Sequence, residues 1–440
     1  MAHRRLRDLL EPALARLPPG PVAVAFSGGL DSTVLLHGLA ALGHARARGL
    51  RAIHVDHGLQ DDSIDWARHC RRIADGLGIE STILQVDVPR GAGLGLEASA
   101  RRVRHAALRD ALADAEILAF AHHRDDQAET VLLKMLRGAG PEGLAAMRVL
   151  RRFGHGRAWR PLLGLPRAAL RSYAQHHGLG WIDDPSNGDP LFDRNYLRLD
   201  VLPRLRKRWP EADASITQSA NWVRAAADYI DAQARHALAQ VQGGDPATLR
   251  FRDWLHLPDA LRDPVLRHWL RGLGLGEPNQ HQVGELVRQL AEAGEDRLPC
   301  VRWPGAELRR YRDLVYALAP LRMVPPGWEI EWSGDSVELP AALGHLRLVD
   351  ACGHARASAA RPAWRIRFRR GGESLRMQGL HRELRDLFQA AGVPPWERGR
   401  IPLVFDARGT LHAVADLWLG DHAGAWLDDA GLRLQWTGTH

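Results

Sequence analysis

The chain has 440 residues, of which 45% are hydrophobic and 25% are charged, and its formal net charge is +7. This composition is typical of a globular protein, and the length suggests roughly three domains. No apolar run approaches the ~20 residues that a membrane-spanning helix needs, so we expect no membrane partner. The positive charge favours a polyanionic partner over an acidic one.

The N-terminus predicts an amphipathic helix. Leucines recur at helical spacing from Leu6 to Leu17, and no continuous apolar stretch suggests a signal peptide. The cysteines, Cys70, Cys300 and Cys352, are odd in number and widely spaced, which fits neither a disulfide framework nor a metal-ligand pair. A reducing cytoplasm is the expected location.

From Pro21 the chain alternates short apolar stretches with helical patterns. The expected strands are "VAVAFS", "RAIHVDHG", "STILQVDV" and "EILAFAHH", which begin at residues 22, 51, 81 and 116. Near-continuous apolar strands separated by helices predict a doubly wound parallel α/β sheet, Rossmann-like, within residues 1–210. In a sheet of order 3-2-1-4, the first and fourth strands are neighbours, and their carboxyl ends form the crevice where ligands bind.

The remaining chain divides by composition into three parts. Residues 211–322 begin with one long helical pattern and predict an all-helical domain. Residues 323–361, with "PPGW" and "GHARASAARP", predict a linker. Residues 362–440 predict a small, basic α+β domain.

The stretch "SGGLDS", Ser27 to Ser32, follows the first strand and opens a helix. Gly28 and Gly29 allow backbone N–H groups to converge on an anion at the helix N-terminus, and Ser27 and Ser32 add hydroxyl donors. The charge of Asp31 would repel a phosphate unless Mg²⁺ bridged the two, so Asp31 is the candidate metal ligand. A plain tight turn with a serine cap is the alternative.

The fourth strand leads into "AHHRDDQAETVLLKMLRG", which starts another helix. Glu129 lies three residues after Asp126, so both carboxylates lie on one helical face. Such a pair suits an ammonium group or a metal, although acidic residues at a helix start also act as simple caps. We expect this loop to face the glycine turn across the crevice.

Two patterns resemble known families. "SGGLDS" after an apolar strand resembles the signature of the PP-loop ATP pyrophosphatases. The second loop, with "RPLL", "WIDDPSNGDPLFDRNYLRLDVLP" and "GVPPWERGRIPLVFD", looks like the tRNA(Ile)-lysidine synthetase family. The residues that carry this second likeness are His122, His123, Asp125, Asp126, Gln127, Glu129 and Thr130, then Arg137, Gly138, Gly140, Gly143, Leu144 and Met147.

The resemblance implies an AMP-forming carbon–nitrogen ligase with ATP as co-substrate and Mg²⁺ as cofactor. Members of the family adenylate the wobble cytidine of isoleucine tRNA with anticodon CAU at the oxygen on ring position 2, and pyrophosphate leaves. Free L-lysine then displaces AMP to form lysidine. Residues 1–210 would be the ATP-binding catalytic domain, and 211–322 and 362–440 would bind tRNA.

The same resemblance implies roles for individual residues. We expect ATP to contact Ser27, Gly28, Gly29, Leu30, Asp31, Ser32, Asp56 and His57. The expected catalytic residues are Asp31, Asp126, Glu129, Arg101 and Arg104, with the two acids of the second loop gripping or deprotonating lysine. Arg101 and Arg104 would lie near the ATP α-phosphate, and surface charge is their alternative role. His105 replaces the family's usual tyrosine.

Two arginine-rich segments predict the RNA contacts. Residues 194–208 hold six basic residues against one acid, and residues 361–400 hold ten arginines against four acids. A solvated charged face is the alternative for either. The expected RNA-binding residues are Arg194, Asn195, Arg198, Arg206, Arg369 and Arg370, of which the first three could instead staple a loop.

Three other functions compete with this interpretation. A PP-loop tRNA thiolase would require a reactive cysteine pair or a C-x-x-C motif, and the chain has neither. An amide-forming PP-loop ligase explains the glycine turn but not the basic modules. A non-catalytic tRNA-binding protein would not need Asp31, Asp126 and Glu129 together. The oligomeric state stays open, with a homodimer as one option.

Overall fold

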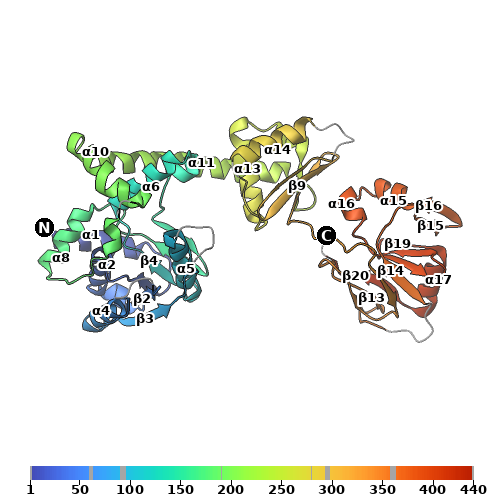
Figure 1. The fold of residues 1–440 in the computed structure, drawn as a ribbon, viewed down its shortest axis with the longest axis horizontal. Coiled ribbons are helices and arrows are strands. Elements are labelled where there is room, and N and C mark those ends of the chain that lie inside the picture. Colours follow the sequence, from blue (N-terminus) through green and yellow to red (C-terminus); the bar gives the residue numbers. More distant parts are fainter. Residues whose placement is uncertain are drawn as a thin grey trace. The chain divides into compact units, whose positions relative to one another are not determined.

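The computed structural model describes residues 2–58, 63–89, 96–189, 191–278, 280–292, 298–356 and 363–438. Two compact units, Met1–Ala232 and Gln233–His440, divide the chain (Figure 1). Each unit is described by itself below. No helix in the described ranges is long and apolar enough to cross a membrane.

The first unit is built on a six-stranded sheet of order β3-β2-β1-β4-β6-β5. Every neighbouring pair is parallel except β5 with β6, which form an antiparallel hairpin at the edge. This confirms the doubly wound parallel fold and the order 3-2-1-4. The strands are β1 (Val22–Ala25), β2 (Arg51–Asp56), β3 (Glu80–Gln85), β4 (Ile117–Ala119), β5 (Leu150–Phe153) and β6 (Gly156–Trp159).

Helices cover both faces of this sheet, as a buried parallel sheet requires. Alternate side chains of β1 point to opposite faces. Val22 and Val24 pack with α1, α2, α4 and α8, whereas Ala23 packs with Leu108 and Leu112 at the end of α5 and just beyond it. Leu6, Leu10 and Leu14 of α1 are buried, which confirms the predicted amphipathic helix. These helices are α1 (Ala2–Ala15), α2 (Leu30–Ala40), α3 (Gly43–Ala47), α4 (Ser63–Gly76), α5 (Leu96–Asp110) and α8 (Arg167–His176).

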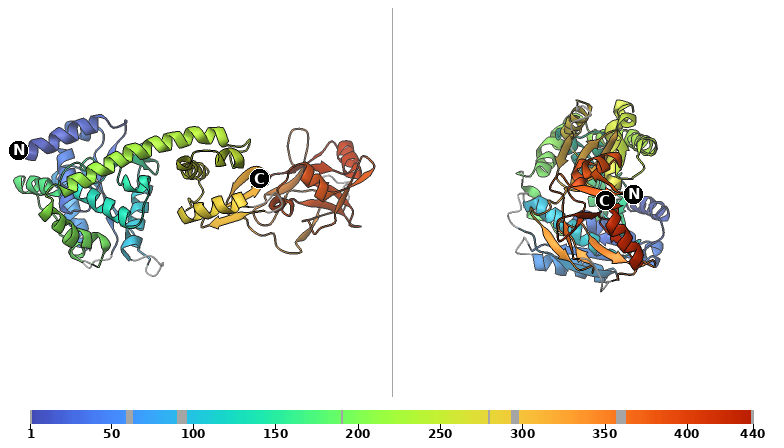
Figure 2. Two further views of the ribbon diagram at one scale, coloured as in Figure 1. Left: turned by 90° about the horizontal axis from the view of Figure 1, so that it is seen from above. Right: turned by 90° about the vertical axis from the view of Figure 1, so that its right-hand side faces the viewer.

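Helix α6 follows β4 and leads into the rest of the first unit. Gln127 of α6 makes two hydrogen bonds of 3.0 Å with the backbone of Met147, which ties the glycine-rich loop after α6 to the helix start. The remaining elements are α6 (Arg124–Leu136), α7 (Pro141–Leu144), a 3₁₀ turn (Pro185–Gly188), α9 (Asp193–Tyr196), a π-helical turn (Leu197–Val201), α10 (Leu202–Arg208) and α11 (Ala212–Val241). The last part of α11, from Gln233 on, belongs to the second unit. The left view of Figure 2 shows α11 along its length.

The middle region contains the predicted helices but is not all-helical. It also holds a four-stranded antiparallel sheet of order β7-β10-β9-β8. The sequence analysis missed these strands because each is only three to six residues long, and one of them, "AELRRY", has two arginines in six residues. The elements are β7 (Thr248–Arg250), α12 (Phe251–Leu255), α13 (Asp259–Gly272), α14 (Gln280–Glu292), β8 (Cys300–Trp303), β9 (Ala306–Tyr311) and β10 (Leu314–Leu318).

The segment predicted as a linker, 323–361, instead supplies strands to the C-terminal domain. β11 pairs with β14 and β13 pairs with β20, and Trp332, Leu346 and Leu348 lie in that domain's core. Residues 357–362 of this segment lie outside the described residues. The strands are β11 (Glu329–Trp332), β12 (Val337–Glu338), β13 (His345–Val349), β14 (Trp364–Arg367), β15 (Ser374–Met377), β16 (Leu380–Glu383), β17 (Leu403–Asp406), β18 (Leu411–Val414), β19 (Trp418–Leu419) and β20 (Arg433–Trp436). With α15 (Leu384–Ala390), α16 (Pro395–Arg398) and α17 (Asp421–Ala430) they form the predicted α+β domain.

Candidate active site

The glycine turn joins β1 to α2 in a conformation that requires glycine. Gly28 has φ of +78°, and a Cβ atom there would lie 2.8 Å from the Cys70 sulfur and 2.9 Å from Ile182 Cδ1. The Ile182 N–H donates to the Gly28 carbonyl at 2.9 Å, so the segment after α8 lies against the turn. Ser27 Oγ lies 3.1 Å from Ser32 Oγ. Two hydroxyls thus gather at the N-terminus of α2, as the sequence predicts.

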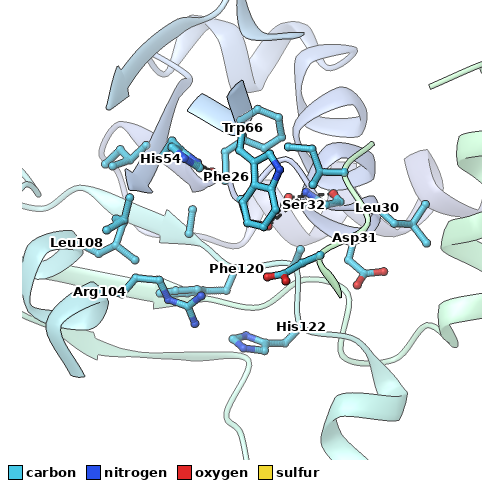
Figure 3. Close-up of a pocket in the computed structure, with 18 of the residues that line it drawn as sticks. Phe26, Leu30, Asp31, Ser32, His54, Trp66, Arg104, Leu108, Phe120 and His122 are labelled. Carbon is cyan, nitrogen blue, oxygen red and sulfur yellow. Dashed lines mark hydrogen bonds between the residues drawn. The ribbon is translucent and has the colours of Figure 1, made fainter. Parts of the chain in front are cut away.

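A pocket opens at the carboxyl ends of β1, β2 and β4 (Figure 3). One wall carries Leu30, Asp31 and Ser32 of the glycine turn, and Arg104, Phe120 and His122 gather elsewhere along the wall. Of the residues predicted to contact ATP, the lining includes Ser27, Gly29, Leu30, Asp31, Ser32, Asp56 and His57. The segment Ile182–Asp184, part of a stretch that carries the family resemblance, also lines it. Trp66 and Arg167 line it as well, and the sequence analysis did not single them out.

Asp31 and the acidic loop meet at His123. The His123 Nε2 atom lies 3.6 Å from Asp31 Oδ2 and 3.4 Å from Asp126 Oδ2. Arg167 Nε lies 3.6 Å from the other Asp31 oxygen, Oδ1, which is buried and has no hydrogen-bond partner among the described residues. The predicted meeting of the glycine turn and the second loop is therefore observed.

His123 also caps α6. Its ring Nδ1 accepts from the Asp126 N–H at 3.4 Å, and Asp126 Oδ2 accepts from the His123 N–H at 3.0 Å. These bonds fit an imidazole with its proton on Nε2, facing both carboxylates. Burial lowers the pKa of His123, but Asp31, Asp126 and Asp125 outweigh it and raise the pKa above its ordinary value.

Two arginines clamp the two acids of the second loop. Glu129 is fully buried, and Arg194 Nε and Arg198 Nε each donate to its carboxylate at 2.7 Å. Both arginines also donate to Asp126 Oδ1 at 3.0 Å. Burial opposes the ionised form of Asp126, but His123 and Arg194 dominate together and lower its pKa to about 2. Asp126 is thus held as a charged acceptor at neutral pH.

The other predicted site residues divide between the pocket and separate ion pairs. Arg104 lines the pocket, and Arg101 lies on the same helix three residues earlier. Arg206 pairs with Asp213 and Asp125. Asn195 is buried and donates to the Asp189 carbonyl at 2.9 Å, which fits a loop staple. In the second unit, Arg369 lies 3.6 Å from Glu373, and Arg370 lies 3.1 Å from Glu329.

Two further histidines of the first unit have defined environments. His54 is buried, and its Nδ1 lies 2.9 Å from the Phe26 carbonyl, as expected for a structural histidine. Cys70 lies beside it, and burial raises the pKa of its thiol to about 12. His105, where the family's tyrosine is expected, stacks on Phe120 with ring centroids 5.9 Å apart. His105 therefore makes a stacking contact at this position.

Known protein families match the chain along most of its length. A PP-loop domain model matches residues 1–205, which implies ATP use. A TilS substrate-binding domain model matches residues 249–316, and a TilS substrate C-terminal domain model matches residues 364–436.

Curated relatives extend these matches to the whole chain. A tRNA(Ile)-lysidine synthase from Xanthomonas campestris pv. campestris strain 8004 is 43% identical over 421 residues, which cover 95% of each chain. The chain belongs to the tRNA(Ile)-lysidine synthase family. The tRNA(Ile)-lysidine synthase of Xanthomonas axonopodis pv. citri strain 306 is also 43% identical, over 97% of this chain and 96% of its own. That of Pseudomonas aeruginosa strain PAO1 is 40% identical, over 95% and 93%.

Membership of the tRNA(Ile)-lysidine synthase family agrees with the resemblance drawn from the second loop. The sequence analysis missed the roles of His123 and Arg167 at Asp31. His123 could have been found, because it stands in the motif immediately before the acidic pair. Arg167 stands in no such motif, and it lies close to Asp31 only because of the fold.

Proposed function

We propose that this protein is an AMP-forming carbon–nitrogen ligase that attaches free L-lysine to ring position 2 of the wobble cytidine of isoleucine tRNA with anticodon CAU. The observation that carries this proposal is the position of His123 between Asp31 and Asp126, 3.6 and 3.4 Å from their carboxylates. The glycine turn and the acidic second loop thereby meet at one pocket, which supports the binding of ATP phosphates and of the lysine ammonium group near each other. The alternative, a tRNA thiolase, would need a reactive thiolate, and Cys70 does not fit that role because burial raises the pKa of its thiol to about 12.

In the first step, the cytosine oxygen attacks the α-phosphate of ATP, the bond to the bridging oxygen breaks, and pyrophosphate leaves. The N-terminus of α2, with the hydroxyls of Ser27 and Ser32 beside it, would bind that leaving group. Negative charge develops on pyrophosphate as the bond breaks, so these donors stabilise the transition state. Arg104, which lines the pocket, would bind the α-phosphate or the resulting ester.

In the second step, the lysine amine forms a bond to ring position 2, the bond from that carbon to oxygen breaks, and AMP leaves. Lysine arrives as an ammonium with a pKa of ~10.4, so desolvation in the pocket must release its proton to water before the amine attacks. Asp126, with its pKa lowered to about 2, is too weak a base for this task and instead binds the ammonium as a charged partner. Arg194 and Arg198 already bind both Asp126 and Glu129. Lysine must therefore share these acids with the two arginines or displace one of the arginines.

The glycine turn also fits a magnesium ion. Asp31 offers a buried carboxylate oxygen that accepts no hydrogen bond from any described residue, and Mg²⁺ prefers carboxylate and phosphate oxygens. We propose that Asp31 holds Mg²⁺, which would neutralise charge on the ATP phosphates. Three free cysteines support a reducing cytoplasm as the site of the reaction.

A labelling assay tests the proposal. Purified protein is incubated with ATP, Mg²⁺, radiolabelled lysine and a transcript of the CAU isoleucine tRNA, and elongator methionine tRNA with the same anticodon serves as the matched control. We expect label in the isoleucine RNA only, with one AMP and one pyrophosphate released per lysine. Label in neither RNA would refute the proposed reaction, and equal label in both would refute its specificity.

A further inference from the structure

Arg167, the first residue of α8, brings a guanidinium group to the glycine turn. Its side chain lines the pocket, and its Nε atom lies 3.6 Å from Asp31 Oδ1. Both atoms are buried, and neither has a hydrogen-bond partner among the described residues. A separation of 3.6 Å is too long for a hydrogen bond. The two side chains therefore attract each other as opposite charges, but a donor and an acceptor stay unsatisfied.

The backbone of Arg167 is held by the second loop. Its N–H donates to Asp125 Oδ1 at 3.0 Å. The Arg124 N–H donates to the Leu165 carbonyl at 2.8 Å, and the Arg124 side chain donates to the Gly164 carbonyl. The starts of α6 and α8 are thus tied together. The Arg167 side chain, in contrast, is 37% exposed at the pocket that it lines.

The arginines that bind the acids of the second loop differ from Arg167 in how their Nε atoms are bound. Arg194 Nε and Arg198 Nε each donate to Glu129 at 2.7 Å, and both side chains also donate to Asp126 at 3.0 Å. Arg167 Nε makes no hydrogen bond to any described residue. Because an unsatisfied buried N–H group costs free energy, Arg167 gains stability when a further anion accepts from it.

The pyrophosphate part of ATP is the anion that fits this position. Asp31 and Ser32 of the glycine turn lie on the pocket wall in Figure 3, and Arg167 lines the same pocket. Asp31 repels phosphate oxygens, and a guanidinium beside it offsets that repulsion. Arginine forks bind phosphate oxygens through charge-assisted hydrogen bonds. Arg104 of α5 is already proposed to bind the α-phosphate, so the β- and γ-phosphates are the groups that lack an arginine.

We propose that Arg167 binds the β- and γ-phosphates of ATP, and that its guanidinium moves from Asp31 to these phosphates when the nucleotide enters. The inference rests on one part of the proposed function, the binding of pyrophosphate by the glycine turn. Negative charge grows on pyrophosphate as its bond to the α-phosphate breaks, so a guanidinium bound there also stabilises the transition state. Asp31 loses its arginine partner in the same movement and becomes available to Mg²⁺.

Helix α8 supplies a matched control. Arg171 lies one turn after Arg167 on the same helix, is exposed, and does not line the pocket. Arg167→Gln and Arg171→Gln therefore remove the same charge from one helix, but only the first changes the pocket. Arg167→Lys keeps the charge and loses the planar fork, so it separates the two contributions.

The experiment measures binding of ATP, pyrophosphate and AMP to the full-length protein by calorimetry, with Mg²⁺ and without RNA or lysine. We expect Arg167→Gln to weaken binding of ATP and of pyrophosphate about tenfold, as for the loss of one charge-assisted hydrogen bond, and to change AMP binding by less than about twofold. AMP serves as the internal control because it lacks the β- and γ-phosphates. Arg167→Lys should weaken pyrophosphate binding only about threefold. Arg171→Gln should stay within about twofold of wild type for all three ligands, because its charge is exposed.

A double variant distinguishes a contact with the phosphates from an effect exerted through Asp31. When Arg167→Gln is added to Asp31→Asn, a direct contact predicts a further loss of pyrophosphate affinity of about tenfold. If Arg167 only neutralises the Asp31 carboxylate, the second substitution causes no further loss.

Four outcomes would overturn the inference. Equal weakening of AMP and pyrophosphate in Arg167→Gln would indicate damage to the whole pocket, and equal weakening in Arg171→Gln would indicate general charge. Unchanged pyrophosphate binding in Arg167→Gln, or no further loss in the double variant, would limit Arg167 to its ion pair with Asp31. A wild-type protein that binds ATP no more tightly than AMP would refute the phosphate site itself.

Failure of this inference and failure of the proposed function give different results, because the binding experiment contains no RNA and no lysine. If any of these outcomes occurs while wild-type protein attaches lysine to the isoleucine transcript, only the role of Arg167 is refuted. If pyrophosphate binding depends on Arg167 as expected but the transcript is never labelled, the lysine transfer is refuted and the role of Arg167 is not.

Discussion

Replacing Glu129 with glutamine separates the two steps of the proposed reaction. Glutamine keeps the size of the side chain but loses the charge that Arg194 and Arg198 bind through three hydrogen bonds of 2.7, 2.7 and 3.0 Å. Its amide NH₂ must then face a guanidinium donor. Because Glu129 is one of the two acids proposed to hold lysine, and the glycine turn is unaltered, we expect pyrophosphate release to persist and the KM for lysine to rise about tenfold or more.

The same substitution has a measurable effect on stability. Removing one partner of a buried ion pair costs about 3–5 kcal/mol. The two arginines are 21% and 24% exposed, so solvent screening reduces the expected loss to about 2–3 kcal/mol. A domain of this size loses about 2–4 °C of Tm per kcal/mol, which gives a fall of about 4–12 °C. Thermal unfolding by circular dichroism measures it.

Asp65→Asn is the matched control for stability, since Asp65 and Arg68 are both 72% exposed. An exposed pair contributes at most about 1 kcal/mol, so its Tm should change by less than about 4 °C. Unchanged Tm in Glu129→Gln would contradict the clamp of two arginines on the acids. Unchanged dependence of product formation on lysine would refute the role of Glu129 in lysine binding.

Three further predictions concern the turn and the second loop. Gly28→Ala should lower the free energy of unfolding by about 1–2 kcal/mol or more, because Gly28 has a positive φ and its Cβ would lie 2.8 and 2.9 Å from other atoms, and it should also weaken ATP binding. Gly76→Ala is the control, because a Cβ there would meet no atom within 4 Å, and its thermal unfolding should match that of wild type. Folding lowers the pKa of Asp126 from 3.8 to about 2, so its ionised carboxylate stabilises the folded state fully above about pH 4, and this stabilisation is lost as the pH falls to about 2. In Asp126→Asn, the free energy of unfolding should therefore change less with pH in that window. Asp31→Asn should raise the Mg²⁺ concentration for half-maximal pyrophosphate release about tenfold while leaving Tm unchanged.

The sequence predicted the first unit well because its signals are local. The sheet order and the meeting of the two loops could be predicted from the apolar strands, the glycines of the turn, and the spacing of Asp126 and Glu129. The middle sheet was missed because strands such as "AELRRY" alternate weakly and bury few apolar side chains. The linker prediction was wrong because Trp332 and Leu346, separated by proline and glycine, join the core only through strands more than thirty residues away.

For the candidate site too, residues in local motifs could be predicted, whereas their partners from distant segments could not. Ser27, Asp31 and Asp126 could be found because each stands in a local motif with a clear chemical reason. The arginines that pair with Asp31 and Asp126 could not, because Arg167, Arg194 and Arg198 come from segments 68 or more residues further along the chain. Arg194 and Arg198 were expected to bind RNA, and the structure places both on the acids of the second loop. Their contact with RNA stays a prediction.

The central claim is that one pocket first activates the RNA base and then receives lysine. The most direct test supplies ATP labelled on the α-phosphate, Mg²⁺ and the CAU isoleucine transcript without lysine. We predict that label becomes attached to the RNA and leaves as AMP only when lysine is added. RNA that never carries the label, or that releases it equally without lysine, would contradict the account.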